Sequence, residues 1–425
     1  MMLLIKNATI IDPTSKLNGK KRDILIVEGR IQSIRAKISE PSATVLDGSG
    51  AYVSPGWIDV GVQTGDPGFE HREDLESLAK AAAAGGFSAV ACLPNTQPCV
   101  HSKSEVLYIK NHTHSTLVDF HPIGAVSHNC EGKDITEMLD MFHSGAVAFS
   151  DGSHSIQDNG LMMRALQYVK AFDGLILNHP HDASIAGKGQ MHEGAISTSL
   201  GMKGLPALAE EIMVQRDLYL ATYTESKIHI SNISTAASVG LLRKAKTSGI
   251  KVSASVAAMN LALSDEVLVD FDSHYKVLPP LRQSADIRAL KRGLKSGAID
   301  FISSNHYPLE LEAKQLEFGY ADFGAIGLET AFALSYSALE EVLDVEELVR
   351  LLAINPREIL SLPVPQIAEQ ATANLTIFHT NMDWTFTEAA IYSKSKNTPF
   401  VGTKFKARVL GVVNNGQHFI TPSHQ

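Results

Sequence analysis

The sequence predicts an α/β protein: a (β/α)8 TIM barrel with a small β-sandwich domain formed from the N- and C-terminal segments. The middle of the chain alternates short apolar segments with helical stretches, which is typical of βα units that build a parallel sheet. Eight such apolar segments can be counted, and this number favours a closed barrel over an open doubly wound sheet. The two ends of the chain contain only short β segments separated by turns.

The terminal β segments are recognised by the turn residues between them, such as Asn18-Gly19 and Glu28-Gly29. We expect strands at 2–11, 23–28 and 30–38 near one end of the chain, and at 375–379, 406–414 and 417–420 near the other. A β-rich head and tail around a different middle predicts one β-sandwich domain from residues 1–54 and 363–425. Two separate β modules would give the same pattern.

The barrel is assigned to residues 55–362. The first predicted helix, 72–84, has an apolar stripe of Leu75, Leu78 and Ala82 and ends at Gly85-Gly86. A later helix is expected at 205–223. The eight barrel strands are predicted at 58–62, 87–93, 117–124, 146–150, 175–178, 228–231, 251–256 and 299–303.

Composition and charge indicate which kinds of partner and which cellular compartment to expect. The 425 residues carry a net charge of -9 without a Lys/Arg run, so no nucleic-acid partner is expected. The three cysteines, Cys92, Cys99 and Cys130, form no Cys-x-x-Cys pair, which indicates a reducing cytoplasm. No apolar run approaches the roughly 18 residues of a membrane span, and the N-terminal apolar run is too short for a signal peptide.

The residues that follow the barrel strands are the candidates for chemistry, because barrel active sites lie at the carboxyl ends of the strands. The set contains one carboxylate, a few imidazoles and several amides, and is therefore poor in metal ligands. Its members are Gln63, Asn95, Asp151, His179, His181, Asn232, Asn260, Asn305 and His306.

Blocks of sequence along nearly the whole chain resemble the bacterial class I dihydroorotases of the amidohydrolase superfamily. The matching blocks are 55–68, 81–87, 94–96, 148–151, 206–212, 234–236, 279–282, 324–330 and 393–400. The resemblance implies a barrel in which two zinc ions polarise the amide of dihydroorotate and lower the pKa of a bridging water, so that hydroxide forms near neutral pH.

The same resemblance allows each ligand position to be checked. Two of the six positions are retained: the bridging carboxylate at Asp151 and the fifth-strand histidine at His179. Four are lost. The first-strand His-x-His pair falls on Gly61 and Gln63, the sixth-strand histidine on Asn232 and the eighth-strand aspartate on Asn305. A neutral amide is a weak zinc ligand, and Asn305 cannot shuttle a proton as the catalytic carboxylate would. No residue is assigned a catalytic role.

Substrate recognition is also expected to be impaired. The arginine that the resemblance places against the substrate carboxylate falls on Gly65, while its partner Asn95 is present. Leu278 replaces an expected asparagine, and Leu309 replaces a histidine after His306-Tyr307-Pro308. We interpret Asn95, Gly65, Leu278 and His306 as relics of a substrate pocket.

The retained polar residues have two interpretations. His179, His181, Asp151 and His306 either form a rebuilt metal site or line a water-filled barrel mouth and bond to one another; the second is preferred, with Asp151 capping nearby backbone amides. His229 is expected to be an interior histidine with satisfied hydrogen bonds. For the Gly-rich segment 184–204, a structural loop and a partner-contact surface remain open.

The sequence thus predicts a dihydroorotase-family protein of pyrimidine biosynthesis that is a pseudoenzyme without a metal centre or other cofactor. By resemblance it is a structural partner of aspartate transcarbamoylase, and we also expect a homo-oligomer. The alternative is an active dihydroorotase, or another cyclic-amide hydrolase, with a non-standard zinc site; the family reaction converts (S)-dihydroorotate to N-carbamoyl-L-aspartate. A sensor that binds a carboxylate ligand in the altered pocket is a third alternative.

Overall fold

A computed structural model describes residues 2–112 and 116–422. Eight parallel strands form one sheet in the order β15-β14-β13-β10-β9-β8-β7-β6, which confirms all eight predicted barrel strands. They are β6 (Trp57–Val62), β7 (Phe87–Cys92), β8 (Asp119–Gly124), β9 (Ala148–Phe149), β10 (Ile176–Asn178), β13 (Ile228–Ile230), β14 (Val252–Ala257) and β15 (Phe301–Ser303).

The barrel closes between its first and last strands through hydrogen bonds near their ends. The Gln63 backbone N–H donates to the His306 carbonyl at 3.2 Å. The buried Asp59 carboxylate of β6 accepts from the Ser304 backbone N–H at 2.8 Å and from the Ser304 hydroxyl. Residues from both ends of the barrel segment therefore meet at one place.

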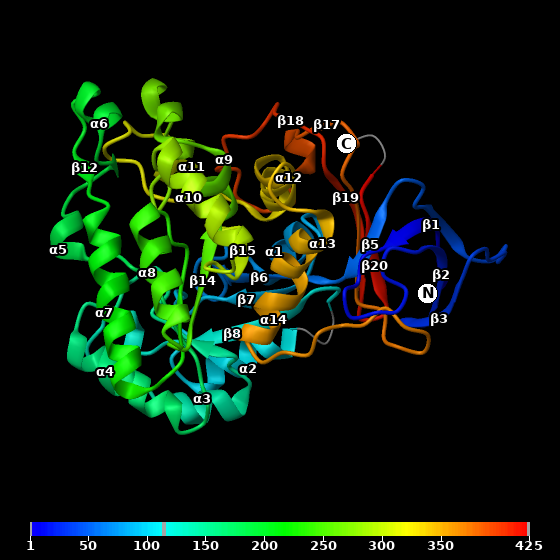
Figure 1. The fold of residues 1–425 in the computed structure, drawn as a ribbon, viewed down its shortest axis with the longest axis horizontal. Helices are drawn as coiled ribbons and strands as arrows, with labels where there is room; N and C mark the ends of the chain where they lie inside the picture. Colours follow the sequence, from blue (N-terminus) through cyan, green and yellow to red (C-terminus); the bar gives the residue numbers. More distant parts are fainter. Residues whose placement is uncertain (1, 113–115, 423–425) are drawn as a thin grey trace.

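Helices surround the barrel, with α4, α7 and α8 on the side away from the β domain (Figure 1). The longer helices are α1 (Leu75–Ala84), α2 (Lys103–His112), α3 (Met138–Ser144), α4 (Asn159–Lys170), α7 (Leu208–Thr224), α8 (Ala236–Thr247), α10 (Ser284–Lys295) and α12 (Leu328–Leu339). The shorter ones are α5 (Ala183–Ala186), α6 (Ala195–Ser199), α9 (Ala258–Ala262), α11 (Leu311–Lys314), α13 (Val345–Val349), a π-helical turn Arg350–Ile354 and α14 (Asn355–Ile359). In the described ranges no helix is both long and apolar enough to cross a membrane.

Helix α1 begins three residues later than the predicted start at residue 72. The Asp74 carboxylate accepts from the Ser77 backbone N–H at 2.7 Å and caps the helix, while the Phe69 N–H bonds to the Gly65 carbonyl and turns the preceding segment. The apolar stripe gave the correct face but could not locate the cap. The helix expected at 205–223 forms α7, which also begins three residues later than predicted but has no side-chain cap at Ala207.

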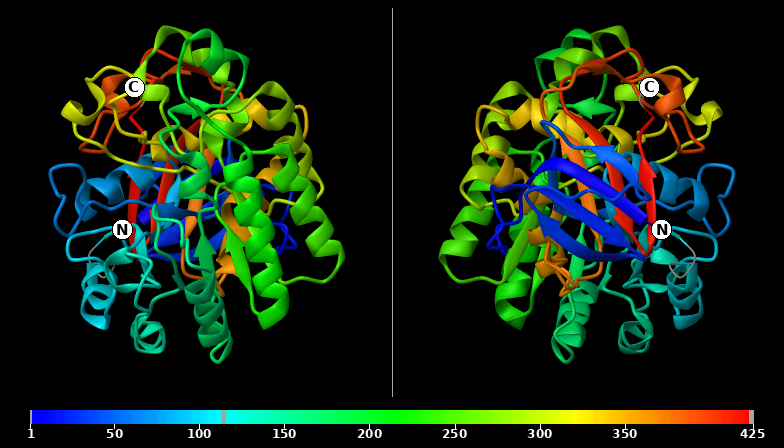
Figure 2. Two further views of the ribbon diagram at one scale, coloured as in Figure 1. Left: turned by 90° about the vertical axis from the view of Figure 1, so that its left-hand side faces the viewer. Right: turned by 90° about the vertical axis from the view of Figure 1, so that its right-hand side faces the viewer.

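The two ends of the chain share one sheet. Its order is β20-β19-β16-β5-β1-β2-β3, with β4 paired to β1, so the two-module alternative is wrong. N-terminal and C-terminal strands lie side by side in the right-hand view of Figure 2. The strands are β1 (Met2–Ile10), β2 (Lys21–Val27), β3 (Arg30–Arg35), β4 (Thr44–Asp47), β5 (Tyr52–Pro55), β16 (Leu375–His379), β19 (Arg408–Asn414) and β20 (Gln417–Ile420).

This β domain has its own apolar core, which includes Leu3, Ile24, Val53 and Leu375. We keep 1–54 and 363–425 as its proposed extent; residues 1 and 423–425 of that extent lie outside the described ranges. Trp57, at the start of β6, joins domain and barrel. Its indole packs against Phe332 of α12 and Phe378 of β16, with ring centroids 4.8 and 5.2 Å away.

The segment 184–204 is more ordered than a Gly-rich loop suggests. It contains parts of α5 and β12 (Gly204–Leu205), all of β11 (Met191–His192) and all of α6, and β11 pairs with β12. Met191 is buried with Leu268 and Phe318. These contacts give the segment a structural role. A small hairpin of β17 (Trp384–Thr385) and β18 (Lys404–Phe405) lies nearer the C-terminus.

Candidate functional site

Two adjoining cavities lie at the carboxyl ends of the barrel strands. The inner cavity measures about 130 Å³ and the outer about 280 Å³, and Gln63, Ser153 and Tyr307 line both. Most residues predicted from the sequence meet here. The inner cavity is lined by Gly61, Gln63, His179, Asn232, Leu278, Asn305 and His306, and the outer one by Gly65 and Asn95.

Two of the amides that replace metal ligands are bonded to each other. The Asn232 Nδ2 donates to Asn305 Oδ1 at 3.1 Å, and the Asn305 Nδ2 donates to the Leu278 carbonyl at 3.1 Å. The Ser303 hydroxyl donates to Asn232 Oδ1 at 2.6 Å. Both asparagines have a positive φ, of 52° and 53°, in the left-handed region that asparagine tolerates better than most residues. The two amides therefore serve the structure of the barrel mouth.

Gln63 takes part in a second network of amides. Its Nε2 donates to Asn95 Oδ1 at 3.2 Å, and the Ser153 backbone N–H donates to the same oxygen at 3.0 Å. The Asn95 Nδ2 donates to the Asp151 carbonyl at 3.0 Å. Asn95 is thus held by contacts from the ends of β6 and β9, and its retention has a structural explanation.

The Asp151 carboxylate is turned toward the segment after β8. One oxygen accepts from the Val126 and Ser127 backbone N–H groups at 3.0 and 2.9 Å, and the other accepts from the Ser127 hydroxyl at 2.5 Å. The side chain is buried, and burial raises its pKa. This is the backbone-capping arrangement that the sequence interpretation preferred for Asp151.

His179 is the retained imidazole of the inner cavity. Its ring stacks on that of His181 with centroids 6.1 Å apart and planes 15° apart. Burial, and then the neighbouring His181, lower the pKa of His179 to about 4. His179 is therefore neutral at pH 7 and able to donate or accept a hydrogen bond.

His229 is buried on β13 and has both ring nitrogens occupied. Nδ1 lies 2.9 Å from the Ser253 hydroxyl and Nε2 lies 3.1 Å from the Ser255 hydroxyl. The ring stacks on Phe301 with centroids 4.8 Å apart. It is placed as the sequence interpretation expected for an interior histidine.

Replacing His229 with glutamine is expected to reduce the acid sensitivity of the fold. Burial lowers the pKa of His229 to about 3, so between pH 6.5 and 4 the unfolded chain binds a proton that the folded chain does not. This histidine's contribution to stability is complete above pH 6.5 and decreases as pH falls. The unfolding free energy of His229→Gln should fall less steeply, by about 1.4 kcal/mol per pH unit.

Urea titrations at several pH values between 4 and 7.5 measure this difference. Exposed His143→Gln is the control for losing an imidazole. Equal slopes for His229→Gln and the unmodified chain would contradict the assignment of His229 as a buried neutral group.

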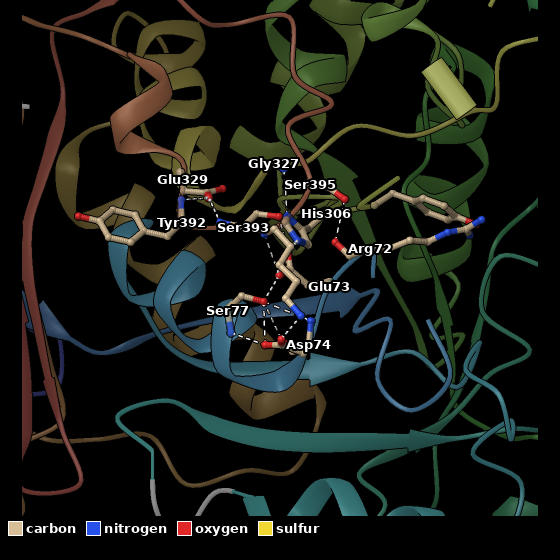
Figure 3. Close-up of polar contacts among 12 residues, drawn as sticks. Arg72, Glu73, Asp74, Ser77, His306, Gly327, Glu329, Tyr392, Ser393 and Ser395 are labelled. Atoms are coloured by element: carbon tan, nitrogen blue, oxygen red, sulfur yellow. Dashed lines mark hydrogen bonds and ion pairs between the residues drawn. The ribbon is translucent and has the colours of Figure 1, made fainter. Parts of the chain in front are cut away.

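A buried polar network behind the inner cavity was not predicted from the sequence (Figure 3). His306 Nε2 lies 3.4 Å from Glu73 Oε2, and His306 Nδ1 accepts from the Gly327 backbone N–H at 3.2 Å, which leaves the ring proton on the side of Glu73. Burial alone would raise the pKa of Glu73. The His306 imidazole and the Ser393 and Ser77 hydroxyls outweigh burial and hold that pKa below its ordinary value.

The same network binds the C-terminal segment to the barrel. Glu329 of α12 accepts from the Tyr392 and Ser393 backbone N–H groups, each at 3.1 Å, and Glu73 accepts from the Lys394 N–H at 3.1 Å (Figure 3). Glu73 follows a turn and precedes a capped helix, so its sequence position does not signal burial. The matched block 393–400 therefore has a structural function.

The backbone at Gly65 leaves no space for the arginine that the resemblance expects. Gly65 has φ +69°, and a Cβ added there would lie 2.4 Å from the Glu73 carbonyl oxygen. Arg72 lines the outer cavity, but its Nη2 donates to Glu310 at 2.9 Å and its guanidinium lies over the Phe69 ring. This cation at the outer cavity is thus already paired with a carboxylate.

The residues at the barrel mouth do not fit a two-zinc centre. Throughout 2–112 and 116–422, no group of three or more His, Cys, Asp or Glu side chains is arranged to hold a metal ion. Gly61 offers no donor, Gln63, Asn232 and Asn305 offer amides already in hydrogen bonds, and both Asp151 oxygens are occupied.

A nearly closed parallel barrel, a mouth formed by the strand ends and a β domain built from both termini define the architecture. Solved structures with the same architecture match over almost the entire chain. L-hydantoinase (dihydropyrimidinase) from Arthrobacter aurescens has a TM-score of 0.86 at 22% identity, covering 99% of this chain and 98% of its own. Dihydropyrimidinase from Brevibacillus agri has a TM-score of 0.83 at 18% identity, covering 99% and 95%. At these identities the likeness shows the fold alone.

Sequence relatives specify the family. The Dihydro-orotase-like family model matches residues 50–238. The dihydroorotase of Pelotomaculum thermopropionicum is 40% identical over 421 residues, which is 98% of each chain. The dihydroorotase of Citrifermentans bemidjiense is 39% identical over 420 residues, 98% of this chain and 99% of its own. The chain belongs to the dihydroorotase family.

Proposed function

We propose that this chain serves pyrimidine biosynthesis as a pseudoenzyme, without the two-zinc centre of an active dihydroorotase, and acts as a structural partner of aspartate transcarbamoylase. The observation that carries the proposal is the Asn232–Asn305 pair. Two positions that would hold a zinc ligand and the proton shuttle are bonded to each other by their amides. Metal-activated water is therefore not available to attack the amide of dihydroorotate, and ordinary water has a pKa near 15.7 and is a poor nucleophile.

The retained blocks support a scaffold rather than a reaction. Glu210 of the block 206–212 accepts from the Ser234 and Thr235 backbone N–H groups at 3.0 Å, and so joins α7 to the start of α8. Arg282 of the block 279–282 donates to the Ser234 hydroxyl at 3.0 Å and to the Leu205 carbonyl at 3.2 Å. These blocks hold the barrel together whether or not it turns over a substrate.

The partnership is tested by mixing the purified chain with aspartate transcarbamoylase from the same organism and measuring the mass of the eluted species by size exclusion with light scattering. We expect a species heavier than either protein alone, containing both. Separate elution at micromolar concentrations of both proteins would contradict the structural role. An unrelated protein with a TIM barrel is the control for non-specific association.

The alternative, an active cyclic-amide hydrolase with a non-standard metal site, is favoured by one finding. Relatives 40% and 39% identical over nearly the entire chain carry the name dihydroorotase. On this alternative, Asp151, His179 and His181 would hold a single metal ion. Turnover of dihydroorotate or a hydantoin at ordinary enzyme rates, about 1 to 10³ per second, would establish it and remove the pseudoenzyme proposal.

A further inference from the structure

Two cysteines far apart in the sequence lie in direct contact beside the outer cavity. The Cys99 and Cys130 sulfurs are 3.2 Å apart, and both side chains are buried in a small cluster with Ala125. Both are free thiols. A disulfide bond measures about 2.05 Å, so the two sulfurs need to approach by only about 1 Å to form one.

The backbone around the pair already holds the two segments together. The Ala125 N–H donates to the Val100 carbonyl at 2.7 Å, and the Asn129 N–H donates to His101 Nδ1 at 3.1 Å. Cys130 closes a short turn, His128–Cys130, in which its φ is +55°. Hydrogen bonds close to both cysteines thus hold the two thiols next to each other.

The two thiols differ in their surroundings. Cys99 is among the residues that line the outer cavity, whereas Cys130 is not. The hydrogen bond with Cys99, followed by burial, raises the pKa of Cys130, which disfavours its thiolate. The third cysteine, Cys92, is buried on β7, and burial and the Asp59 carboxylate raise its pKa.

We propose that Cys99 and Cys130 form a dithiol site that hydrogen peroxide oxidises to an intramolecular disulfide. The Cys99 thiolate attacks the peroxide, an S–O bond forms as the O–O bond breaks, and the leaving hydroxide takes a proton to become water. The Cys130 sulfur then attacks the Cys99 sulfenic acid, an S–S bond forms as the S–O bond breaks, and a second water leaves. Two thiols are oxidised and one peroxide is reduced.

The disulfide would covalently join two segments that shape the mouth of the barrel. Cys99 follows the turn that carries Asn95, and Cys130 follows Ser127, which binds the Asp151 carboxylate. The site is independent of the proposed role with transcarbamoylase, because it rests on the thiol pair and not on the lost metal ligands.

The test treats the purified full-length chain with hydrogen peroxide, denatures it, alkylates it with N-ethylmaleimide and measures its intact mass. We expect a chain about 2 Da lighter before alkylation that takes up one maleimide, on Cys92, in place of three, with all three restored by dithiothreitol. Three reactive thiols after peroxide, or disulfide-linked dimers on a non-reducing gel, would overturn the proposal.

Two variants separate the steps. Cys92→Ser should form the same disulfide, because the pair does not involve residue 92. Cys130→Ser cannot form it and should accumulate a Cys99 sulfenic acid that dimedone labels. Dimedone labelling of Cys92 instead of Cys99 would overturn the assignment. Because the mass measurement on the unmodified chain is independent of both variants, a variant that fails to fold leaves the main test intact.

Discussion

The double variant Gly61→His, Gln63→His hydrolyses dihydroorotate no faster than the unmodified chain. Restoring the first-strand pair supplies two imidazoles, but Asn232 and Asn305 still offer amides in place of an imidazole and a carboxylate. No side chain at Gly65 can pair with the substrate carboxylate. The shortfall from an active enzyme is the entire metal-dependent rate enhancement, at least about 10⁶-fold.

Stability controls accompany this test because position 61 has φ +93°, where side chains are strained although no atom lies within 4 Å of an added Cβ. Gly61→Ala should cost about 1–2 kcal/mol in unfolding free energy, whereas Gln63→His, outside the left-handed region, lacks this cost. Turnover is measured with added zinc on variants whose circular dichroism matches that of the unmodified chain. Zinc-dependent turnover in the double variant would refute this account of the site.

The variant Glu210→Ala unfolds at a much lower denaturant concentration, with a loss of about 3–5 kcal/mol. The Glu210 carboxylate is buried and accepts from the Ser234 and Thr235 N–H groups and the Ser238 hydroxyl, with the Arg282 guanidinium 3.8 Å away. Removing it leaves the buried Arg282 guanidinium without this counter-charge and the Ser234 and Thr235 N–H groups without their acceptor. Glu210 thus contributes to the stability of the barrel and not to the site, since it is not among the lining residues of either cavity.

Guanidinium unfolding followed by circular dichroism measures this loss. Glu211→Ala, on the adjacent and only half-buried residue of α7, should change the unfolding free energy by less than about 0.5 kcal/mol and serves as the matched control. Glu210→Gln keeps the shape and should fall between the two. Equal stability of Glu210→Ala and Glu211→Ala would show that the retained block does not hold the barrel.

The fold was predictable because its signals are local. Alternation of strand and helix located all eight barrel strands, and turn residues separated the terminal strands. Two features depended on contacts that apolar periodicity does not indicate. The terminal strands share one sheet through the pairing of β5 with β1 and β16, and α1 begins where Asp74 caps it. Neither pairing nor capping follows from apolar periodicity alone.

The residues of the site could be predicted from the sequence, but the directions of their side chains could not. The family resemblance identified the positions that line the mouth, yet the direction of the Asp151 carboxylate and the Asn232–Asn305 bond required coordinates. The burial of Glu73 and the lack of space at Gly65 could not be predicted either, because both depend on contacts that the neighbouring residues in the sequence do not indicate. The Cys99–Cys130 contact joins residues whose spacing matches no cysteine motif.

Zinc binding tests the central claim most directly. The purified chain is incubated with excess zinc, passed over a desalting column and analysed for metal per chain, with dihydroorotate turnover measured on the same sample. The account predicts far less than one zinc per chain and no turnover above background. One or two zinc ions per chain, lost together with turnover in a His179→Ala variant, would contradict it.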